Sequence, residues 1–182
     1  MHIAWAFDKE LITLDDVKEL LFELPLSEEK DQDPVSMAIV KGLRNGHVQS
    51  DEFIAFVRDA LTVDANRLLG HTLYCYRHIV TQNDVPWDRL GPVLGDVIRQ
   101  APSSIALKAI EVVGAETESG AIGWNDVDSL LLTARQAEDP VVAAEPFGVT
   151  RAGLKKGVFT WDEIESIYPA SLASEDPAVV QK

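Results

Sequence analysis

Histidine and cysteine are the side chains in this sequence best suited to hold a metal ion or to act as a nucleophile. The histidines are His2, His47, His71 and His78, and the only cysteine is Cys75. His71 and His78 lie seven residues apart, so a helix would place them on one face two turns apart. Two histidines without a nearby third ligand make a poor metal site. The apolar neighbours of Cys75 favour a small buried side chain over a nucleophile. We therefore expect no metal ion and no other cofactor.

Pairs of acidic residues could act as general acid and base. Such pairs stand at Asp15-Asp16, Asp51-Glu52 and Asp162-Glu163. They recur at nearly equal steps, which favours a structural role at helix starts. Trp87, Trp124 and Trp161 also recur, 37 residues apart, and are interpreted as packing between repeats. No phosphate-binding loop, dinucleotide-binding loop, nucleophile elbow or HExxH motif is present. The sequence therefore predicts a protein that is not an enzyme.

One group of residues departs from simple packing. Arg67, His71, Tyr74 and His78 follow steps of 4, 3 and 4, which places them on one stripe of a helix, and Arg and Tyr are enriched at binding hot spots. Steps of 37 residues lead from this stripe to Ser104, Lys108, Glu111 and Glu145, and Lys41 extends it toward the N-terminus. We predict a partner-binding surface made of Arg67, His71, Tyr74, His78, Lys108, Glu111, Glu145 and Lys41. An ordinary solvated face is the alternative.

The elements that carry these residues follow from a recurring helix-start motif. It begins at Ile12, Val48, Val85, Ile122 and Phe159, at steps of 36, 37, 37 and 37 residues. An apolar residue recurs five positions after each of these, as in a hydrophobic staple, in which one apolar residue before the helix packs on one in its first turn. Thr160 and Glu163 have the spacing of a capping box. Each motif therefore predicts the start of a helix.

Helix stops and second helices keep the same period. Gly46, Asn83, Gly120 and Gly157 precede four of the starts, and Gly and Asn tolerate the left-handed conformation that ends a helix. Asp33-Pro34, Asp139-Pro140 and Asp176-Pro177 suit an N-cap and a first helical residue. The predicted second helices cover 35–43, 65–80, 103–113 and 141–154, and the last contains Pro146 and Gly148, which can split or kink it. Each unit is therefore expected to be two antiparallel helices.

The Asp-Pro pairs, the period near 37 and the two helices per unit resemble the HEAT/armadillo-like superfamily. Small or apolar residues follow the pairs at Val35, Met37, Ala38, Val141, Ala143 and Ala144. The resemblance implies an all-α fold, an α-solenoid of about four helix-pair repeats of ~37 residues with an incomplete C-terminal capping unit. The expected single domain spans 1–182, with repeats near 11–46, 47–83, 84–120 and 121–157 and a partial cap at 158–182. The resemblance also implies a concave face that grips a partner.

Composition limits the class of partner. The chain has 16 basic and 30 acidic residues, a net charge of −14, which disfavours nucleic acid and anionic lipid and favours a basic protein such as a toxin domain. No long apolar run or signal-peptide pattern is present, so a cytoplasmic protein is expected. The leading hypothesis is a bacterial immunity or inhibitor protein that blocks a cognate toxin. An adaptor or assembly scaffold is the alternative, and an enzyme on a HEAT-like fold is a second alternative.

Overall fold

Helices form all the regular structure in the part of the chain that the computed structural model describes, which is residues 6, 12–23, 34–79 and 84–168. The protein is therefore all-α, as the sequence predicts. The helices are α2 (Leu14–Glu23), α3 (Pro34–Arg44), α4 (Ser50–Thr62), α5 (Asn66–Ile79), α6 (Trp87–Gln100), α7 (Ser103–Ser119), α8 (Trp124–Arg135), α9 (Pro140–Lys156) and α10 (Trp161–Ile164), followed by a 3-10 turn at Glu165–Ile167. Asn83 and residues 169–182 lie outside the described residues.

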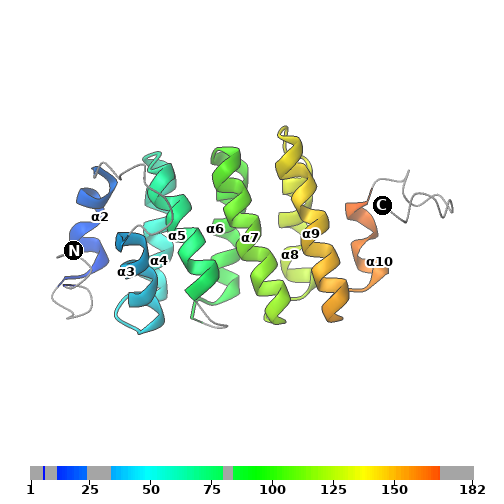
Figure 1. The fold of residues 1–182 in the computed structure, drawn as a ribbon, viewed down its shortest axis with the longest axis horizontal. Coiled ribbons are helices and arrows are strands. Elements are labelled where there is room, and N and C mark those ends of the chain that lie inside the picture. The colour runs from blue at the N-terminus through cyan, green and yellow to red at the C-terminus, as the bar shows by residue number, and fades with distance from the viewer. Residues whose placement is uncertain (1–5, 7–11, 24–33, 80–83, 169–182) are drawn as a thin grey trace.

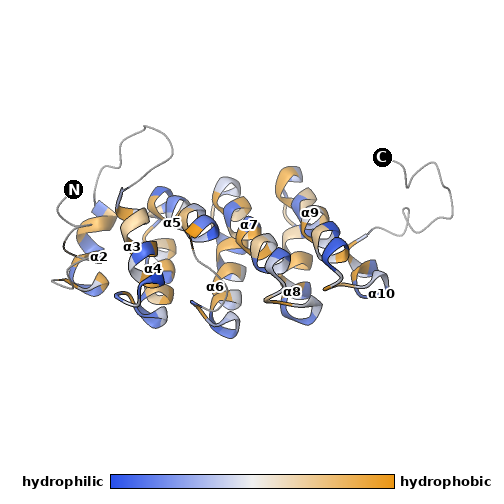
Figure 2. Cartoon of the chain, turned by 60° about the horizontal axis from the view of Figure 1, so that its bottom comes forward, coloured by the Kyte–Doolittle hydropathy of each residue, from blue (hydrophilic) through white to orange (hydrophobic). Residues whose placement is uncertain are grey.

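The helices stand side by side in two layers (Figure 1). One layer holds α3, α5, α7 and α9, each packed on the next, and we call it the odd layer. The other holds α2, α4, α6, α8 and α10, packed in the same order, and we call it the even layer. Consecutive helices such as α6 and α7 pack across the two layers. Hydrophobic and hydrophilic residues share each of the long helices (Figure 2), as expected for helices that bury one side.

Acidic residues at the helix starts act as caps. The carboxylates of Asp16, Glu52, Asp126 and Glu163 each accept a hydrogen bond from the backbone N–H three residues earlier, at 2.7–2.8 Å. Pro86 has no N–H to donate, and Arg89 stands where the other helices carry the acid. Arg89 instead forms an ion pair with Asp51 of the preceding unit. The structural role predicted for the paired acids is confirmed.

Helix ends also follow the sequence. Gly46, Gly120 and Gly157 have φ of 79°, 80° and 73°, the left-handed conformation that glycine adopts without strain. Asp139 caps α9 by accepting from the N–H of Val141, and Pro140 is the first helical residue. Pro146 and Gly148 do not split the last of these helices, since α9 is one helix from Pro140 to Lys156.

The first residues of α4, α6 and α8 each link one unit to the next. Ser50 Oγ donates to the carbonyl oxygen of Asp84 at 2.8 Å, and Trp87 Nε1 donates to that of Asp126 at 3.1 Å. Trp124 stacks edge-on against Phe159 with ring centroids 5.5 Å apart. Trp87 and Trp124 therefore pack between units as expected, whereas Trp161 is 66% exposed.

Candidate functional site

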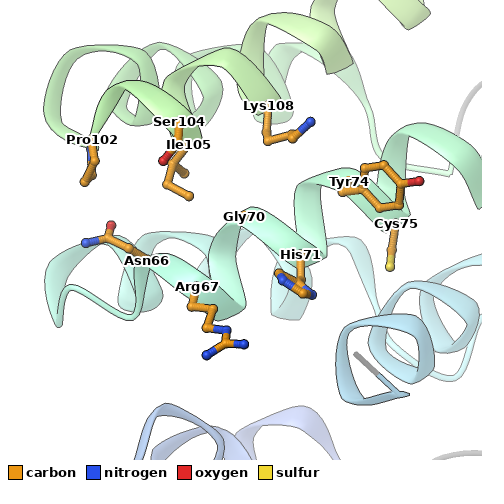
Figure 3. Close-up of a pocket in the computed structure, with 10 residues that line it drawn as sticks. All are labelled: Asn66, Arg67, Gly70, His71, Tyr74, Cys75, Pro102, Ser104, Ile105 and Lys108. Carbon is orange, nitrogen blue, oxygen red and sulfur yellow. The ribbon is translucent and has the colours of Figure 1, made fainter. Parts of the chain in front are cut away.

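A surface cleft of about 480 Å³ lies between α5 and α7 of the odd layer (Figure 3). The helices approach closely at Gly70, where an added Cβ would lie 2.6 Å from Ile105 Cδ1. Glycine at this position therefore sets the spacing of the two helices. The cleft is lined by Asn66, Arg67, Gly70, His71, Tyr74, Cys75, Pro102, Ser104, Ile105 and Lys108.

Four of the predicted partner-binding residues line this cleft. Arg67, His71 and Tyr74 come from α5, and Lys108 comes from α7. The first three lie on one face of α5, and the packing of α5 on α7 brings Lys108 next to them. The structure therefore places the centre of the predicted surface at a real concavity.

Polar contacts join the two helices beside the cleft. Lys108 Nζ lies 5.5 Å from the centroid of the Tyr74 ring and 3.1 Å from Glu111 Oε2. The same Glu111 oxygen accepts from Arg77 Nη1 at 2.8 Å. His78 packs edge-on against the ring of Tyr74, with centroids 4.6 Å apart. Predicted residues Glu111 and His78 thus support the cleft from its edge, although neither lines it.

The remaining predicted residues lie apart from the cleft. Lys41 is exposed on α3 and Glu145 is half-buried on α9, and neither lines the cavity. The predicted stripe therefore spans the whole odd layer, whereas the hollowed part belongs to α5 and α7.

Some residues that line the cleft were not predicted from the sequence. Asn66, Gly70 and Ile105 were not singled out, and Cys75 was interpreted only as a buried side chain, which it is at 3% exposure. Gly70 offers the one sequence signal that could have helped, since glycine inside a helix often marks a close approach. Asn66 Oδ1 is shielded from solvent and has no hydrogen-bond partner among the described residues.

Charge is divided unevenly between the two layers. The even-numbered helices carry 13 acidic and 5 basic residues, a net charge of −8. The odd-numbered helices carry 4 acidic and 8 basic residues, a net charge of +4. Among the described helices, the excess of acidic residues therefore lies in the layer opposite the cleft.

A half-buried carboxyl, that of Glu116, lies toward the C-terminal end of α7. Burial raises the pKa of Glu116, the nearby Asp84 raises it further, and a hydrogen bond from the Tyr76 hydroxyl only partly offsets the rise. Burial also raises the pKa of Tyr76, whose ring stacks on Phe53 at 5.4 Å. We interpret Tyr76 and Glu116 as part of the packing between α5 and α7.

The raised pKa of Glu116 predicts a pH-dependent stability. Above its ordinary pKa of 4.5 the unfolded chain releases this proton first, so stability is lost as pH rises toward the higher pKa of the folded state. We expect Glu116→Gln to be more stable than the parent above that window, with the difference shrinking as pH falls toward 4.5. Urea unfolding over a pH series measures this. Glu118→Gln, exposed on the same helix, is the control, and a difference that grows on acidification would contradict the assignment.

A metal-ligand cluster and a membrane-spanning helix were two further possibilities for the described residues. No group of three or more His, Cys, Asp or Glu side chains there is arranged to hold a metal ion. No helix in the described ranges is long and apolar enough to cross a membrane.

Comparison with known proteins yields no relative from which a function could be carried over. No family model, curated protein sequence or solved structure matches the chain.

Proposed function

We propose that this chain is an α-solenoid similar to HEAT and armadillo repeats and acts as a non-catalytic module that binds another protein through its odd layer. Two features support the repeat architecture. Even helices begin at positions 14, 50, 87, 124 and 161, close to a constant step. Each helix also packs on the helix one unit away in its own layer. Such stacking buries apolar faces that a single helix pair cannot bury alone.

The observation that carries the proposal is the cleft between α5 and α7. It combines Arg67 with Tyr74, whose side chain is 40% exposed although it is large and apolar. Arg and Tyr dominate the energetics of protein interfaces because they join a large contact area to directional hydrogen bonding. Both residues stand on packed helices, so the backbone that carries them need not become ordered when a partner binds.

Within this class we favour an immunity or inhibitor protein that occludes a cognate toxin. The small size and the absence of recognisable catalytic motifs in the sequence support a role that consists of binding alone. A net charge of −14 would attract a basic toxin at long range, whereas the odd-numbered helices themselves carry a net charge of +4, so the attraction acts on the approach rather than at the contact.

The test is co-purification with the product of the adjacent gene, followed by titration of the purified pair. We expect Tyr74→Ala to weaken the complex about tenfold or more, which corresponds to about 1.4 kcal/mol. Arg67→Ala and His78→Ala should weaken it to a smaller extent. Arg58→Ala, on the exposed surface of α4 in the even layer, is the matched control. Unchanged affinity in all three odd-layer variants, with the complex intact, would refute binding through this layer.

An adaptor or assembly scaffold is the second candidate, and the exposed Trp161 favours it. This residue lies on α10 at the end of the row of helices and is 66% exposed (Figure 1). If the end of the solenoid carries the interaction, Trp161→Ala weakens the complex and Tyr74→Ala does not. The same titration therefore separates the two candidates.

A further inference from the structure

We propose that two copies of this chain associate through the end of the row that α9 and α10 form. A two-fold axis would relate the copies and place the odd layer of each against the even layer of the other. This surface lies away from the cleft between α5 and α7 (Figure 1), so the inference goes beyond the proposed function and does not depend on it. The clefts of both copies stay open in such a dimer.

The repeat shows which side chain of α9 faces the end of the row. On α5, Arg77 forms an ion pair with Glu111 of the next odd helix. One period later on α7, Gly114 approaches Val149 of α9, where an added Cβ would lie 3.5 Å from Val149 Cγ2. One further period leads to Arg151, which is exposed and has no following odd helix among the described residues. Arg151 therefore faces the place where another unit would pack.

The even layer gives the same result at α10. Trp87, the first residue of α6, donates a hydrogen bond to the backbone of α8, whereas Trp161 at the equivalent position of α10 is 66% exposed. Lys18, the fifth residue of α2, contacts Asp59 of α4 at 2.8 Å. Glu165 is the fifth residue counted from the start of α10, and it is exposed. Trp161 and Glu165 therefore lie on the same end of the row as Arg151, and we call this surface the end face.

Opposite charges occupy the two edges of the end face. Helix α9 carries three basic residues and one acidic residue, whereas α10 and its 3-10 turn carry three acidic residues and no basic one. The exposed charges are Arg151, Lys155, Lys156, Asp162 and Glu165. None of these five forms an ion pair with another described residue. The end face is therefore complementary in charge to a second copy of itself.

Position along the helices decides which groups meet. Arg151 lies seven residues before Val158 in the turn, and Glu165 lies seven residues after it. Lys155 and Trp161 lie three residues before and after the same point. Members of each pair thus stand at about the same height on the two edges. A two-fold axis between the layers sets Arg151 against Glu165 of the other copy, as an ion pair, and Lys155 against the exposed Trp161 ring, as a cation–π contact.

An aromatic cluster lies between these two charged edges. The ring of Tyr168 lies 5.1 Å from that of Phe147 on α9 and 6.0 Å from that of Trp161 on α10. The Tyr168 hydroxyl is held 3.2 Å from Thr150 Oγ1, so the cluster joins the two layers. Stable interfaces combine an aromatic centre with a charged rim. A second copy would therefore bury the Trp161 side chain over this centre.

Head-to-tail stacking is the competing arrangement of two copies, because it would continue the row of helices. Even helices pack on even helices, so it would place α10 of one copy on α2 of the next. Helix α2 carries four acidic residues and one basic residue, and α10 with its turn carries only acidic ones. Two acidic helices repel each other, whereas the two-fold arrangement joins opposite charges. We therefore favour the two-fold dimer.

Sedimentation velocity of the full-length protein between about 1 and 200 μM tests the proposal. We expect a monomer–dimer equilibrium that Trp161→Ala weakens about tenfold or more. Arg151→Glu and Glu165→Arg should each weaken it to a similar extent, because each sets like charges against one another twice. An equimolar mixture of these two variants should dimerise again, since both facing pairs then become opposite in charge. Asp88→Arg, exposed on α6 within the row, changes the net charge as Glu165→Arg does and should dimerise as the wild type does.

Four results would overturn the proposal. The first is a monomer at every concentration, which is expected if residues 169–182 of the same chain cover the end face. The second is unchanged dimerisation of the single variants, and the third is a mixture that associates no better than its components. The fourth is growth beyond a dimer, which is expected for head-to-tail stacking. Circular dichroism melts establish that each variant is folded, and Arg151→Glu/Glu165→Arg in one chain should dimerise with itself.

Discussion

Truncation of Phe53 to alanine is expected to lower the free energy of unfolding by about 3–5 kcal/mol. Phe53 is 0% exposed and stacks on Tyr76 of the neighbouring helix at 5.4 Å. It is also the apolar residue that follows Val48 by five positions, so it supports the start of α4 as well as the contact with α5. Urea unfolding followed by circular dichroism measures the loss.

Two control variants test whether the loss comes from the buried volume of Phe53. Phe53→Leu keeps most of the buried volume and should cost clearly less than Phe53→Ala. Trp161→Ala removes a larger aromatic side chain from the equivalent region of α10, but that side chain is 66% exposed, so a loss of about 1 kcal/mol or less is expected. A loss below about 1 kcal/mol for Phe53→Ala would contradict the packing described here.

Replacement of Gly153 by alanine is expected to destabilise the protein by about 2–3 kcal/mol, although alanine is the better helix former. An added Cβ would lie 2.1 Å from Cδ2 of Phe159, which is buried at 3% exposure against the stacked Trp124. Neither the helix backbone nor the Phe159 ring can move without disturbing the junction of α9 and α10. Denaturant titration again supplies the measurement.

Gly148 offers a matched control in the same helix. It is exposed on α9, and the nearest atom to an added Cβ is Glu145 Oε1 at 3.9 Å. Gly148→Ala should therefore stabilise the protein by about 0.5–1 kcal/mol. A double-mutant cycle with Phe159→Ala should show that removing the ring relieves part of the cost of Gly153→Ala, and purely additive effects would count against the clash.

The same close contact occurs at an equivalent position near the N-terminus. Gly42 lies three periods of 37 residues before Gly153, and an added Cβ there would meet Val48 Cγ2 at 2.9 Å. Val48 and Phe159 are the apolar residues that precede α4 and α10, so in both units a glycine in the odd helix makes room for the next helix start. The two intervening units carry Ile79 and Glu116 at this position, and there the junction is packed differently.

Several sequence-based expectations needed correction or refinement. Helical period places Leu20 and Leu21 on one apolar face of α2, yet Leu20 is 53% exposed whereas Leu21 is buried. Leu20 lies in α2, which has a neighbouring even helix on one side only among the described residues, so less of its surface is covered. Pro146 also leaves α9 unbroken, because that helix is held by packing on both α7 and α8.

The sequence by itself determined where helices begin and end. Caps such as Asp16 and Glu163 bind a backbone group three residues away, and Gly46 and Gly157 end helices through their own φ angles. These interactions are local, so residue type and spacing suffice to predict them. The period of 37 residues follows from the same local signals, and so does the stripe that contains Arg67 and Tyr74.

Only the tertiary structure decided which of those stripe residues form a site. Lys108 meets the Tyr74 ring, and Glu111 meets Arg77, across 34 residues of sequence in each case. These contacts depend on how closely α5 and α7 approach at Gly70, a distance set by side-chain packing rather than by helical period. The division of charge between the layers also depends on the fold, because a net charge of −14 gives the excess of acidic residues and not the layer into which each helix packs.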